Sequence, residues 1–324
     1  MLKKITVLLL SVLLALTSAG FLFSCEKTGG QKKYSVVTTI YPEYDWVMNI
    51  LGENAEDFEV TVLLDNGADL HSYQPSAKDI VKVSSCDLFV YVGGESDEWV
   101  GGALDSAGND KITAINLLGT LGDKAKTEEA VEGMQHEHEG GEEHEEELDE
   151  HVWLSLGNAK IFVDAIAEAI GKIDAENSSV YAANAAAYYA KLHALDEKYR
   201  AAVSSAARDT ILVADRFPFR YLVDDYNIKY FAAFAGCSAE TEASVETIAF
   251  LVNKTDELEL DVILETESGN GKIAATIKRD CNLENKANIE VLKLDSFQSA
   301  TKNNAVSYLS VMESNLEVLK KALA

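Results

Sequence analysis

The chain has 324 residues, of which 47% are hydrophobic and 25% are charged, and its formal net charge at pH 7 is -26. This length is enough for two hydrophobic cores of ordinary domain size. The acidic balance excludes nucleic acid as a partner, because a phosphate backbone is bound by a basic protein face.

The N-terminus has the order of a secretory signal peptide. Two lysines precede the apolar run ITVLLLSVLLALTSAGFLF, and a small serine stands before Cys25. The sequence LFSC resembles the lipobox of bacterial lipoproteins, in which the cysteine is acylated. We predict a leader over 1–24, lipidation at Cys25 and a tether over 25–33, which places the protein outside the cytoplasm on a membrane anchor.

Two alternatives to this leader remain open. One is a secreted protein without lipid. A retained transmembrane helix is less favoured, because the apolar run is only about 19 residues long and a polar segment follows it. Removal of the leader takes away two lysines and no acidic residue, so the mature net charge becomes about -28.

Short β-rich segments alternate with helical patterns in the first part of the mature chain. We predict strands at 35–40, 58–64, 87–92 and 111–117, and helices at 42–51 and 76–85. Buried strands followed by helices are typical of a parallel sheet that helices cover. Residues 34–156 are therefore predicted to form a first α/β lobe.

His71 follows the predicted strand 58–64 and the turn-like sequence DNGAD. Its imidazole is expected in a loop beyond the carboxyl end of that strand, where open α/β sheets bind ligands. A single loop histidine is more often an ordinary surface residue. His71 is a candidate metal ligand because of the other side chains that we expect beside it.

An acidic, low-complexity segment extends from about residue 124 to 149 and contains His136, His138 and His144. This composition cannot bury a core, so we predict a disordered loop. Its imidazoles and carboxylates can bind divalent metal weakly and raise the local metal concentration. We interpret it as an auxiliary metal-gathering loop, with a solvated loop without function as the alternative.

His151 ends this loop in the sequence DEHVWLSLGNAK, which turns abruptly apolar at VWL. The chain re-enters the fold here, so packing can hold the imidazole in place, as a metal ligand requires. The alternative is a histidine that only ends the charged loop.

Residues 157–207 are predicted to be a helical connector. The stretch 177–204 contains no Pro or Gly and keeps an apolar face through residues such as Tyr188 and Leu192. One helix of this length would be about 40 Å long and would act as a stiff link between two lobes. His193 on this helix is interpreted as a surface or packing residue.

The last part of the chain repeats the alternation and is predicted to form a second lobe over 208–324. We expect strands at 210–214, 229–234, 261–265 and 290–294, and helices at 217–226, 244–258, 271–281 and 304–322. The predicted fold class is therefore α/β, with two lobes that each hold a parallel sheet of about four strands, joined by a long rigid helix.

Two carboxylates stand at the ends of predicted strands in this second lobe. Asp215 follows the strand 210–214, and Glu265 ends the strand 261–265. Asp215 can instead cap the next helix or pair with Arg216, and Glu265 can be an exposed carboxylate near Lys272. With two imidazoles from the first lobe, these carboxylates would suit zinc or manganese in a cleft between the lobes.

With Cys25 assigned to lipid, Cys86, Cys237 and Cys281 remain, an odd number for an oxidising compartment. Cys86 precedes the apolar sequence DLFVYV and is expected to be a buried thiol. Cys237 and Cys281 can then form a disulfide, although three cysteines allow three pairings.

Several segments resemble the metal-binding substrate-binding proteins of zinc and manganese ABC importers, lipoproteins related to the receptor of the high-affinity zinc uptake system. They are VVTTIYPEYDWVMNILG, HSYQPSAKDIVKVSSCDLFVYVGGESDEWV, the His-rich loop before DEHVWLS, and SYLSVMESNLEVLKKAL at the end. They cover nearly the whole mature chain. The resemblance implies two lobes joined by a long rigid helix, with the metal between them.

The resemblance also implies a ligand set. His71 matches the first ligand of the family, and His151 matches the second, in its D-P-H-V-W-L motif. Glu150 stands where the family usually has Pro, which is expected to loosen the loop at this point.

At the third position zinc receptors usually carry His and manganese receptors Glu, and we place Asp215 there. In that alignment the segment DRFPFRY is one residue longer than the family pattern, so Arg216 is the alternative residue at the ligand position. Glu265 matches a carboxylate used by some zinc receptors, with Glu267 as a nearby substitute.

The resemblance implies a monomeric extracytoplasmic receptor and not an enzyme. It would capture zinc, with manganese as the alternative, and deliver the metal to an ABC permease whose ATPase is a separate chain, since the sequence has no P-loop. The His-rich loop and the intrinsic order of affinities favour zinc. A surface-anchored zinc-dependent hydrolase is the enzyme alternative, but the sequence has no H-E-x-x-H and no G-x-S-x-G. An adhesive lipoprotein would explain the anchor but not the convergent ligands.

Overall fold

A computed structural model describes residues 33–107, 111–135, 147–238, 242–284, 286–304 and 307–324. The predicted leader, Cys25, and the loop histidines His136, His138 and His144 lie outside these described residues. Tyr34–Ala324 form one compact unit. Within the described ranges, no helix combines the length and the apolar character needed to cross a membrane.

The first half of the unit contains a parallel four-stranded sheet in the order β2-β1-β3-β4. Its strands are β1 (Tyr34–Thr38), β2 (Phe58–Val62), β3 (Leu88–Tyr91) and β4 (Thr113–Asn116), and the helices that follow them are α2 (Tyr41–Leu51), α3 (Ala77–Ser85), α4 (Trp99–Ser106) and α5 (Leu117–Leu121). The predicted strands and helices are present. The short helices α4 and α5 were not predicted, because WVGGALDS and LLGTL carry glycines and too few turns for a helical period.

The second half repeats this topology in a sheet of order β6-β5-β7-β8, again with parallel pairs. Its strands are β5 (Thr210–Phe217), β6 (Lys229–Ala235), β7 (Val262–Thr266) and β8 (Glu290–Leu294), and its helices are α8 (Arg220–Tyr226), α9 (Val245–Glu257), α10 (Lys272–Asp280) and α11 (Tyr308–Ala322). β5 runs three residues beyond the predicted end at 214. Its pairing with β6 is irregular between Val213 and Arg216.

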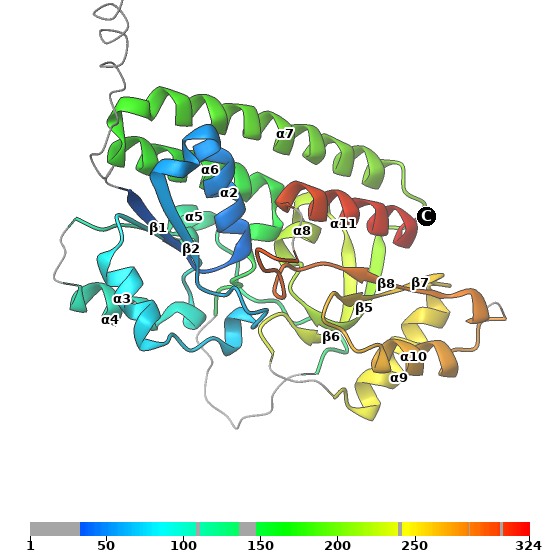
Figure 1. Cartoon of the computed structure of the whole chain (residues 1–324). Helices are drawn as coiled ribbons and strands as arrows, with labels where there is room; N and C mark the ends of the chain where they lie inside the picture. The colour runs from blue at the N-terminus through cyan, green and yellow to red at the C-terminus, as the bar shows by residue number, and fades with distance from the viewer. Residues whose placement is uncertain (1–32, 108–110, 136–146, 239–241, 285, 305–306) are drawn as a thin grey trace, which may run out of the picture. The chain divides into compact units, whose positions relative to one another are not determined.

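Two long helices, α6 (Leu156–Ile173) and α7 (Ser178–Ser204), connect the halves. α7 runs along one side of the unit above α2 and α11 (Figure 1). The hydroxyl of Tyr188 donates to Asp45 of α2 at 3.1 Å, and the hydroxyl of Tyr199 donates to the Met312 carbonyl of α11 at 2.6 Å. The prediction of a long connector helix is therefore confirmed.

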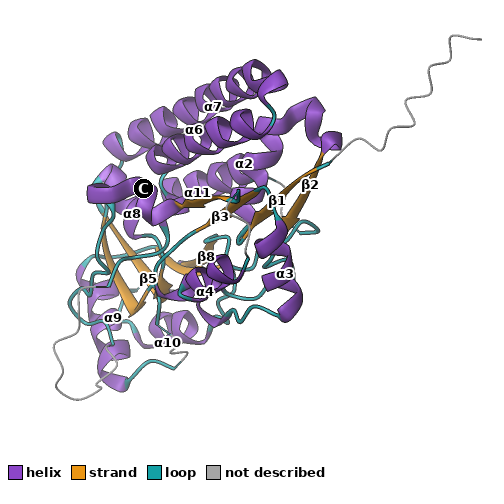
Figure 2. Cartoon of the chain, turned by 90° about the vertical axis from the view of Figure 1, so that its left-hand side faces the viewer, coloured by secondary structure: helices purple, strands orange, loops and turns teal. Residues whose placement is uncertain are grey.

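One continuous apolar core reaches both sheets. It includes Leu88 of β3, Leu192 of α7 and Leu264 of β7, all fully buried. Figure 2 shows the α6 and α7 helices packed side by side next to the sheets. The α/β class with two parallel four-stranded sheets is confirmed, whereas lobe boundaries at 156 and 207 stay a prediction.

Candidate metal centre

His71 is held by a short 3-10 turn, Leu70–Ser72, that follows β2. The side chain of Asp69 caps this turn by accepting a hydrogen bond from the His71 backbone N–H at 3.1 Å. The imidazole is 14% exposed. Its Nδ1 atom lies 3.1 Å from Ser96 Oγ and 3.3 Å from Glu150 Oε2.

His151 immediately precedes the 3-10 turn Val152–Leu154, and its side chain is fully buried. Asp149 Oδ1 accepts from both the backbone N–H of His151 at 2.8 Å and ring Nδ1 at 3.0 Å. Trp153 packs against the ring, with centroids 5.3 Å apart, and donates from Nε1 to the Ser296 carbonyl at 2.9 Å. Packing thus fixes this imidazole where the sequence becomes apolar.

The Nε2 atoms of His71 and His151 face each other at 3.1 Å. Each ring has a carboxylate at Nδ1, which assigns the Nδ1 proton and leaves the Nε2 lone pairs directed at one another. A cation between the two atoms, either a proton or a metal ion, would remove the repulsion between these lone pairs. Zinc–nitrogen bonds of about 2.0–2.1 Å in a tetrahedron would separate two ligand nitrogens by about 3.3 Å.

Glu150 supports this arrangement from the side of the first sheet. It accepts hydrogen bonds from Ser96 N at 2.8 Å and from Ser96 Oγ at 2.5 Å, and its side chain is only 3% exposed. Gly94, with φ at +81°, lets the carboxylate approach, because a Cβ there would lie 2.4 Å from Glu150 Oε1. The expected loosening of the loop by Glu150 is therefore wrong: this residue ties the loop to the 3-10 turn Glu95–Asp97 that follows β3.

Charge and burial oppose each other at this pair. Burial is the largest influence on His71 and by itself lowers the pKa of the ring, but the hydrogen bond that the ring donates to Glu150 and the charges of Asp69 and Glu150 outweigh it and raise that pKa. Burial likewise tends to raise the pKa of Glu150, and its bonds to His71 and Ser96 bring the net pKa below the usual value. The site therefore favours a cation at His71.

A third side chain reaches these imidazoles from the second sheet. One ring nitrogen each of His71 and His151 and the Sγ atom of Cys237 all lie within 4.8 Å of one another. Burial, followed by the charges of Glu128, Asp149 and Glu150, raises the pKa of the Cys237 thiol. Sequence reasoning missed this thiol as a site residue, because it was considered only for a disulfide.

The disulfide between Cys237 and Cys281 is not formed in the structure, where Cys86, Cys237 and Cys281 are free thiols. Cys281 is fully buried in a separate core cluster between α9, α10 and the second sheet, and its Sγ contacts the Lys278 carbonyl at 3.4 Å. Cys237 points instead to the two imidazoles. Cys86 is buried, as expected.

The two predicted carboxylate ligands lie elsewhere in the second sheet. Asp215 sits in the irregular part of β5, where Oδ2 accepts from Thr266 Oγ1 at 2.6 Å and Oδ1 from the Arg216 backbone N–H at 2.9 Å. Glu265 is 6% exposed, with Lys293 at 3.8 Å, and both carboxylates flank Gly269. Among the described residues, neither belongs to the group formed by the imidazoles.

The positions of Asp215 and Glu265 therefore do not favour the prediction that these carboxylates are metal ligands. Glu267, the suggested substitute, accepts hydrogen bonds from Ser296 and Ser299 and is also occupied. His193 is exposed on α7, and it lies near Glu197 and Asp196, whose carboxylate is bound by Lys160 and Tyr226. The interpretation of His193 as a surface residue agrees with this exposure.

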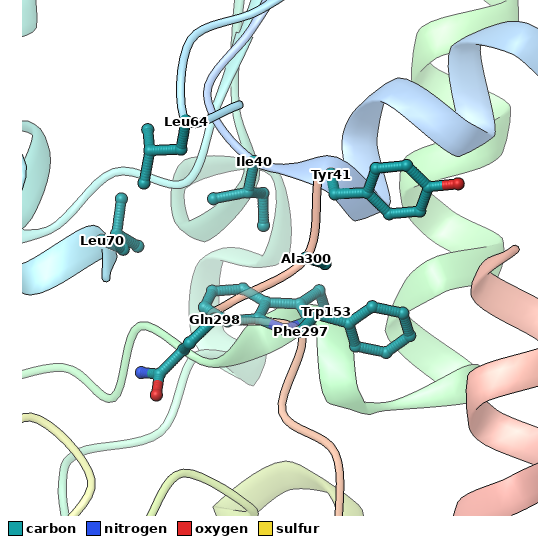
Figure 3. Close-up of a pocket in the computed structure, with 8 residues that line it drawn as sticks. All are labelled: Ile40, Tyr41, Leu64, Leu70, Trp153, Phe297, Gln298 and Ala300. Carbon is teal, nitrogen blue, oxygen red and sulfur yellow. The ribbon is translucent and has the colours of Figure 1, made fainter. Parts of the chain in front are cut away.

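Two cavities lie near the cluster, one small and mainly apolar, the other larger and mainly acidic. Figure 3 shows the side chains that line one cavity, among them Ile40, Leu70 and Trp153, with the Gln298 amide directed away from Ile40 and Tyr41. The volume of this cavity is only about 10 Å³. The Gln298 amide lies 3.0 Å from His151 Nε2. The larger cavity has a volume of about 380 Å³ and is lined by His71, Glu95, Ser96, Glu98, Glu147, Leu148, Glu150 and Cys237. A cation can therefore approach the imidazoles along an acidic wall.

Comparison with known proteins assigns the family. The model of the family described as zinc-uptake complex component A, periplasmic, matches residues 36–322. The chain is 32% identical over 314 residues to the zinc-binding lipoprotein AdcA of Streptococcus pneumoniae, covering 96% of this chain and 60% of that relative. It is 31% identical over 296 residues to the high-affinity zinc uptake system protein ZnuA of Bacillus subtilis, covering 90% and 88%.

Solved structures agree with this assignment. The Zn(II)-bound ZnuA-like domain of Streptococcus pneumoniae AdcA superposes with a TM-score of 0.69 at 28% identity, over 90% of this chain and 99% of that one. The lipoprotein YcdH of Bacillus subtilis gives 0.71 at 28% identity over the same shares. The chain spans about 60% of the length of the AdcA relatives and nearly the whole of the ZnuA-like domain. From residue 36 to residue 322, this chain belongs to the family of the periplasmic zinc-uptake component A.

Proposed function

We propose that this protein is the extracytoplasmic receptor of an ABC importer for a divalent metal, with zinc favoured over manganese. His71 and His151 bind the metal as cargo between the carboxyl edges of the two sheets. Cys25 anchors the receptor to the membrane through lipid, and a permease with a separate ATPase receives the metal. The relatives named for zinc binding and zinc uptake support this proposal.

The observation that carries the proposal is the pair of Nε2 atoms at 3.1 Å. Both rings are oriented by carboxylates at Nδ1, as the ligating histidines of metal sites commonly are. A histidine that only packs in the core does not need its ring oriented in this way. The orientation directs one lone pair of each ring toward the same point, where one ion can bind both. The residues come from distant parts of the chain, so the fold itself assembles the pair.

The His-rich segment is proposed to gather metal beside this site. Its two flanks are well placed for that role: Gln135 N–H donates to the Ala233 carbonyl of β6 at 3.0 Å, and the Glu147 carbonyl accepts from Glu128 N–H at 2.8 Å. Glu147 also lines the acidic cavity. Metal from this segment would then enter the cavity that Glu147 and His71 both line.

A competition titration with a chelator of known affinity tests the proposal. Zinc and manganese are titrated into the chain from Glu26 onward, which retains the compact unit, after removal of bound metal. We expect one tight zinc site that His71→Ala or His151→Ala weakens by at least 100-fold, since each imidazole is a direct ligand. Replacement of 136–146 by an equally long Gly and Ser linker should remove only weaker sites.

His193→Ala is the matched control, because this exposed imidazole has carboxylates nearby but lies on α7. Tight zinc binding that survives both His71→Ala and His151→Ala would contradict the site. A preference for manganese would move the proposal to a manganese receptor. Metal-dependent ester or peptide hydrolysis that His151→Ala abolishes would favour the hydrolase.

A further inference from the structure

We infer that Cys237 is the third metal ligand, so that the cargo is held by two imidazoles and one thiolate. This inference rests on the proposed function and specifies the donor set of that site. Its first support is distance: the thiol sulfur and one nitrogen of each ring lie within 4.8 Å of one another. Zinc–sulfur and zinc–nitrogen bonds of about 2.3 and 2.0–2.1 Å would place sulfur and nitrogen about 3.6 Å apart. A movement of at most about 1.2 Å closes the difference between these distances.

The fold holds Cys237 at this place by backbone contacts. The backbone N–H of Cys237 donates to Glu128 Oε1 at 2.9 Å. Gly236 precedes it, and a Cβ at this glycine would lie 2.9 Å from the Phe217 carbonyl and 3.0 Å from His151 Cε1. The absence of a side chain at 236 therefore lets the end of β6 pass directly beside the His151 ring, and the next side chain reaches the metal position.

Arg216 explains why the end of β5 does not supply the third ligand. Its guanidinium donates to Asp69 Oδ2 at 2.7 Å and to the Ser238 carbonyl at 3.4 Å. Guanidinium is a permanent cation with no lone pair to offer a metal. Arg216 therefore links Asp69, two residues before His71, with Ser238, the residue after Cys237. This link holds the loop that contains His71 close to the loop that contains Cys237.

The topology places the two loops in equivalent positions. β2 and β6 are the corresponding edge strands of sheets ordered β2-β1-β3-β4 and β6-β5-β7-β8. His71 lies in the loop after β2, and Cys237 lies two residues after the end of β6. The site thus takes one donor from the same edge of each sheet, and His151 from the segment between the halves.

A thiolate donor has a consequence for the choice of cargo. Thiolate ligands favour zinc strongly and suit manganese poorly, whereas carboxylates suit manganese. As the metal–sulfur bond forms, the thiol proton passes to solvent, because the metal binds the thiolate. The fourth ligand would come from the open cavity, which His71 and Cys237 both line. Selectivity for zinc would therefore reside in Cys237.

Cobalt(II) is the probe, because a cobalt–thiolate bond gives an intense charge-transfer absorption in the near ultraviolet that imidazole and carboxylate ligands do not give. We expect this band in the chain from Glu26 onward. Cys237→Ser should abolish the band and lower zinc affinity by on the order of 100-fold or more. It should also reduce the ratio of zinc to manganese affinity. Cys281→Ala, which removes a thiol outside the cluster, should keep the band.

A second measurement remains decisive if Cys237→Ser folds poorly. In the unsubstituted protein, saturating zinc should slow alkylation of Cys237 by iodoacetamide, as read by mass spectrometry of the peptide. Tight cobalt binding without the band, or full zinc affinity in a folded Cys237→Ser protein, would overturn the inference and leave the receptor intact. Failure of the proposed function has a different outcome, namely no tight ion in the unsubstituted protein or unchanged binding in His71→Ala.

Discussion

At the scale of single residues, the proposed metal site depends on side chains outside the proposed ligand set. Glu150 and Asp149 each orient one imidazole through Nδ1, and both are almost fully buried. Such outer partners fix the tautomer and the direction of the ligand lone pair. The sequence does not predict this role. Glu150 belongs to a run of acidic residues, and the sequence pattern does not distinguish one carboxylate of that run from another.

The substitution Glu150→Gln should lower zinc affinity by about 10-fold to 100-fold. A glutamine has one acceptor oxygen, which cannot serve both Ser96 and His71 as the carboxylate does, and it lacks the charge that favours a cation. Glu98→Gln is the matched control, since Glu98 lines the same cavity, whereas the polar contacts of the His71 ring are with Ser96, Glu150 and His151. Equal affinity in the Glu150→Gln protein, measured by chelator competition, would remove Glu150 from the site.

Asp97 is a buried carboxyl group, 4% exposed, that accepts from the Gly93 N–H at 2.9 Å. Burial above all raises its pKa to about 6, and the charge of Glu150 adds to this. The protonated form is therefore the one the fold prefers. The contribution of Asp97 to stability is complete below about pH 4 and is lost as the pH rises through 6.

Asp97→Asn should therefore stabilise the protein at pH 7.5, by up to about 3 kcal/mol, and have little effect at pH 4. Urea unfolding at several pH values measures this difference in unfolding free energy. The exposed Asp123→Asn serves as the control and should show no such pH dependence. A stabilisation that is the same at both pH values would contradict the assignment to the Asp97 carboxyl.

At the scale of elements, the irregularity in β5 decides which side chain faces which neighbour. A strand that ended at 214 would place Asp215 in a loop at the sheet edge, free to reach a metal. β5 instead continues to Phe217 through a register shift after Val213, and Asp215 turns to Thr266 of β7. A bulge reverses the expected direction of a side chain, because successive residues of a strand point to opposite faces.

The helix α7 is expected to stabilise both halves through its buried face. Leu192→Ala should lower the unfolding free energy by about 2–5 kcal/mol, because Leu192 is fully buried in the core that reaches both sheets. The adjacent Lys191→Ala, on the exposed face, should change it by no more than about 0.5 kcal/mol. Equal effects of the two substitutions on the urea midpoint would show that α7 does not pack as described.

At the scale of the whole molecule, the two sheets share one core, and the group of His71, His151 and Cys237 draws its side chains from both halves of the chain. Trp46 and Tyr308 pack together with ring centroids 5.2 Å apart, although α2 and α11 lie near opposite ends of the compact unit's sequence. Contacts of this kind couple the halves, so that neither half retains its full core alone. We expect cooperative unfolding of Tyr34–Ala324.

Fluorescence and circular dichroism should therefore report one coincident urea transition. Free zinc at 100 times its dissociation constant should raise the unfolding free energy by about 2.7 kcal/mol, because it binds only the folded state. In the His71→Ala protein the unfolding transition should stay single, and the same zinc concentration should no longer raise the unfolding free energy. Two separate transitions would show that the halves fold independently.

The sequence by itself determined the α/β class, the order of the strands along the chain and the long connector, and it singled out His71 and His151 as candidate ligands. These follow from local patterns: apolar periodicity, the length of a helix without Pro or Gly, and the position of His71 and His151 beside predicted apolar segments. Only the tertiary structure decided which side chains of the second half meet those imidazoles. The bulge in β5, the close approach at Gly236 and the position of Cys237 depend on how one sheet edge packs against another, and residue spacing carries no measure of that packing.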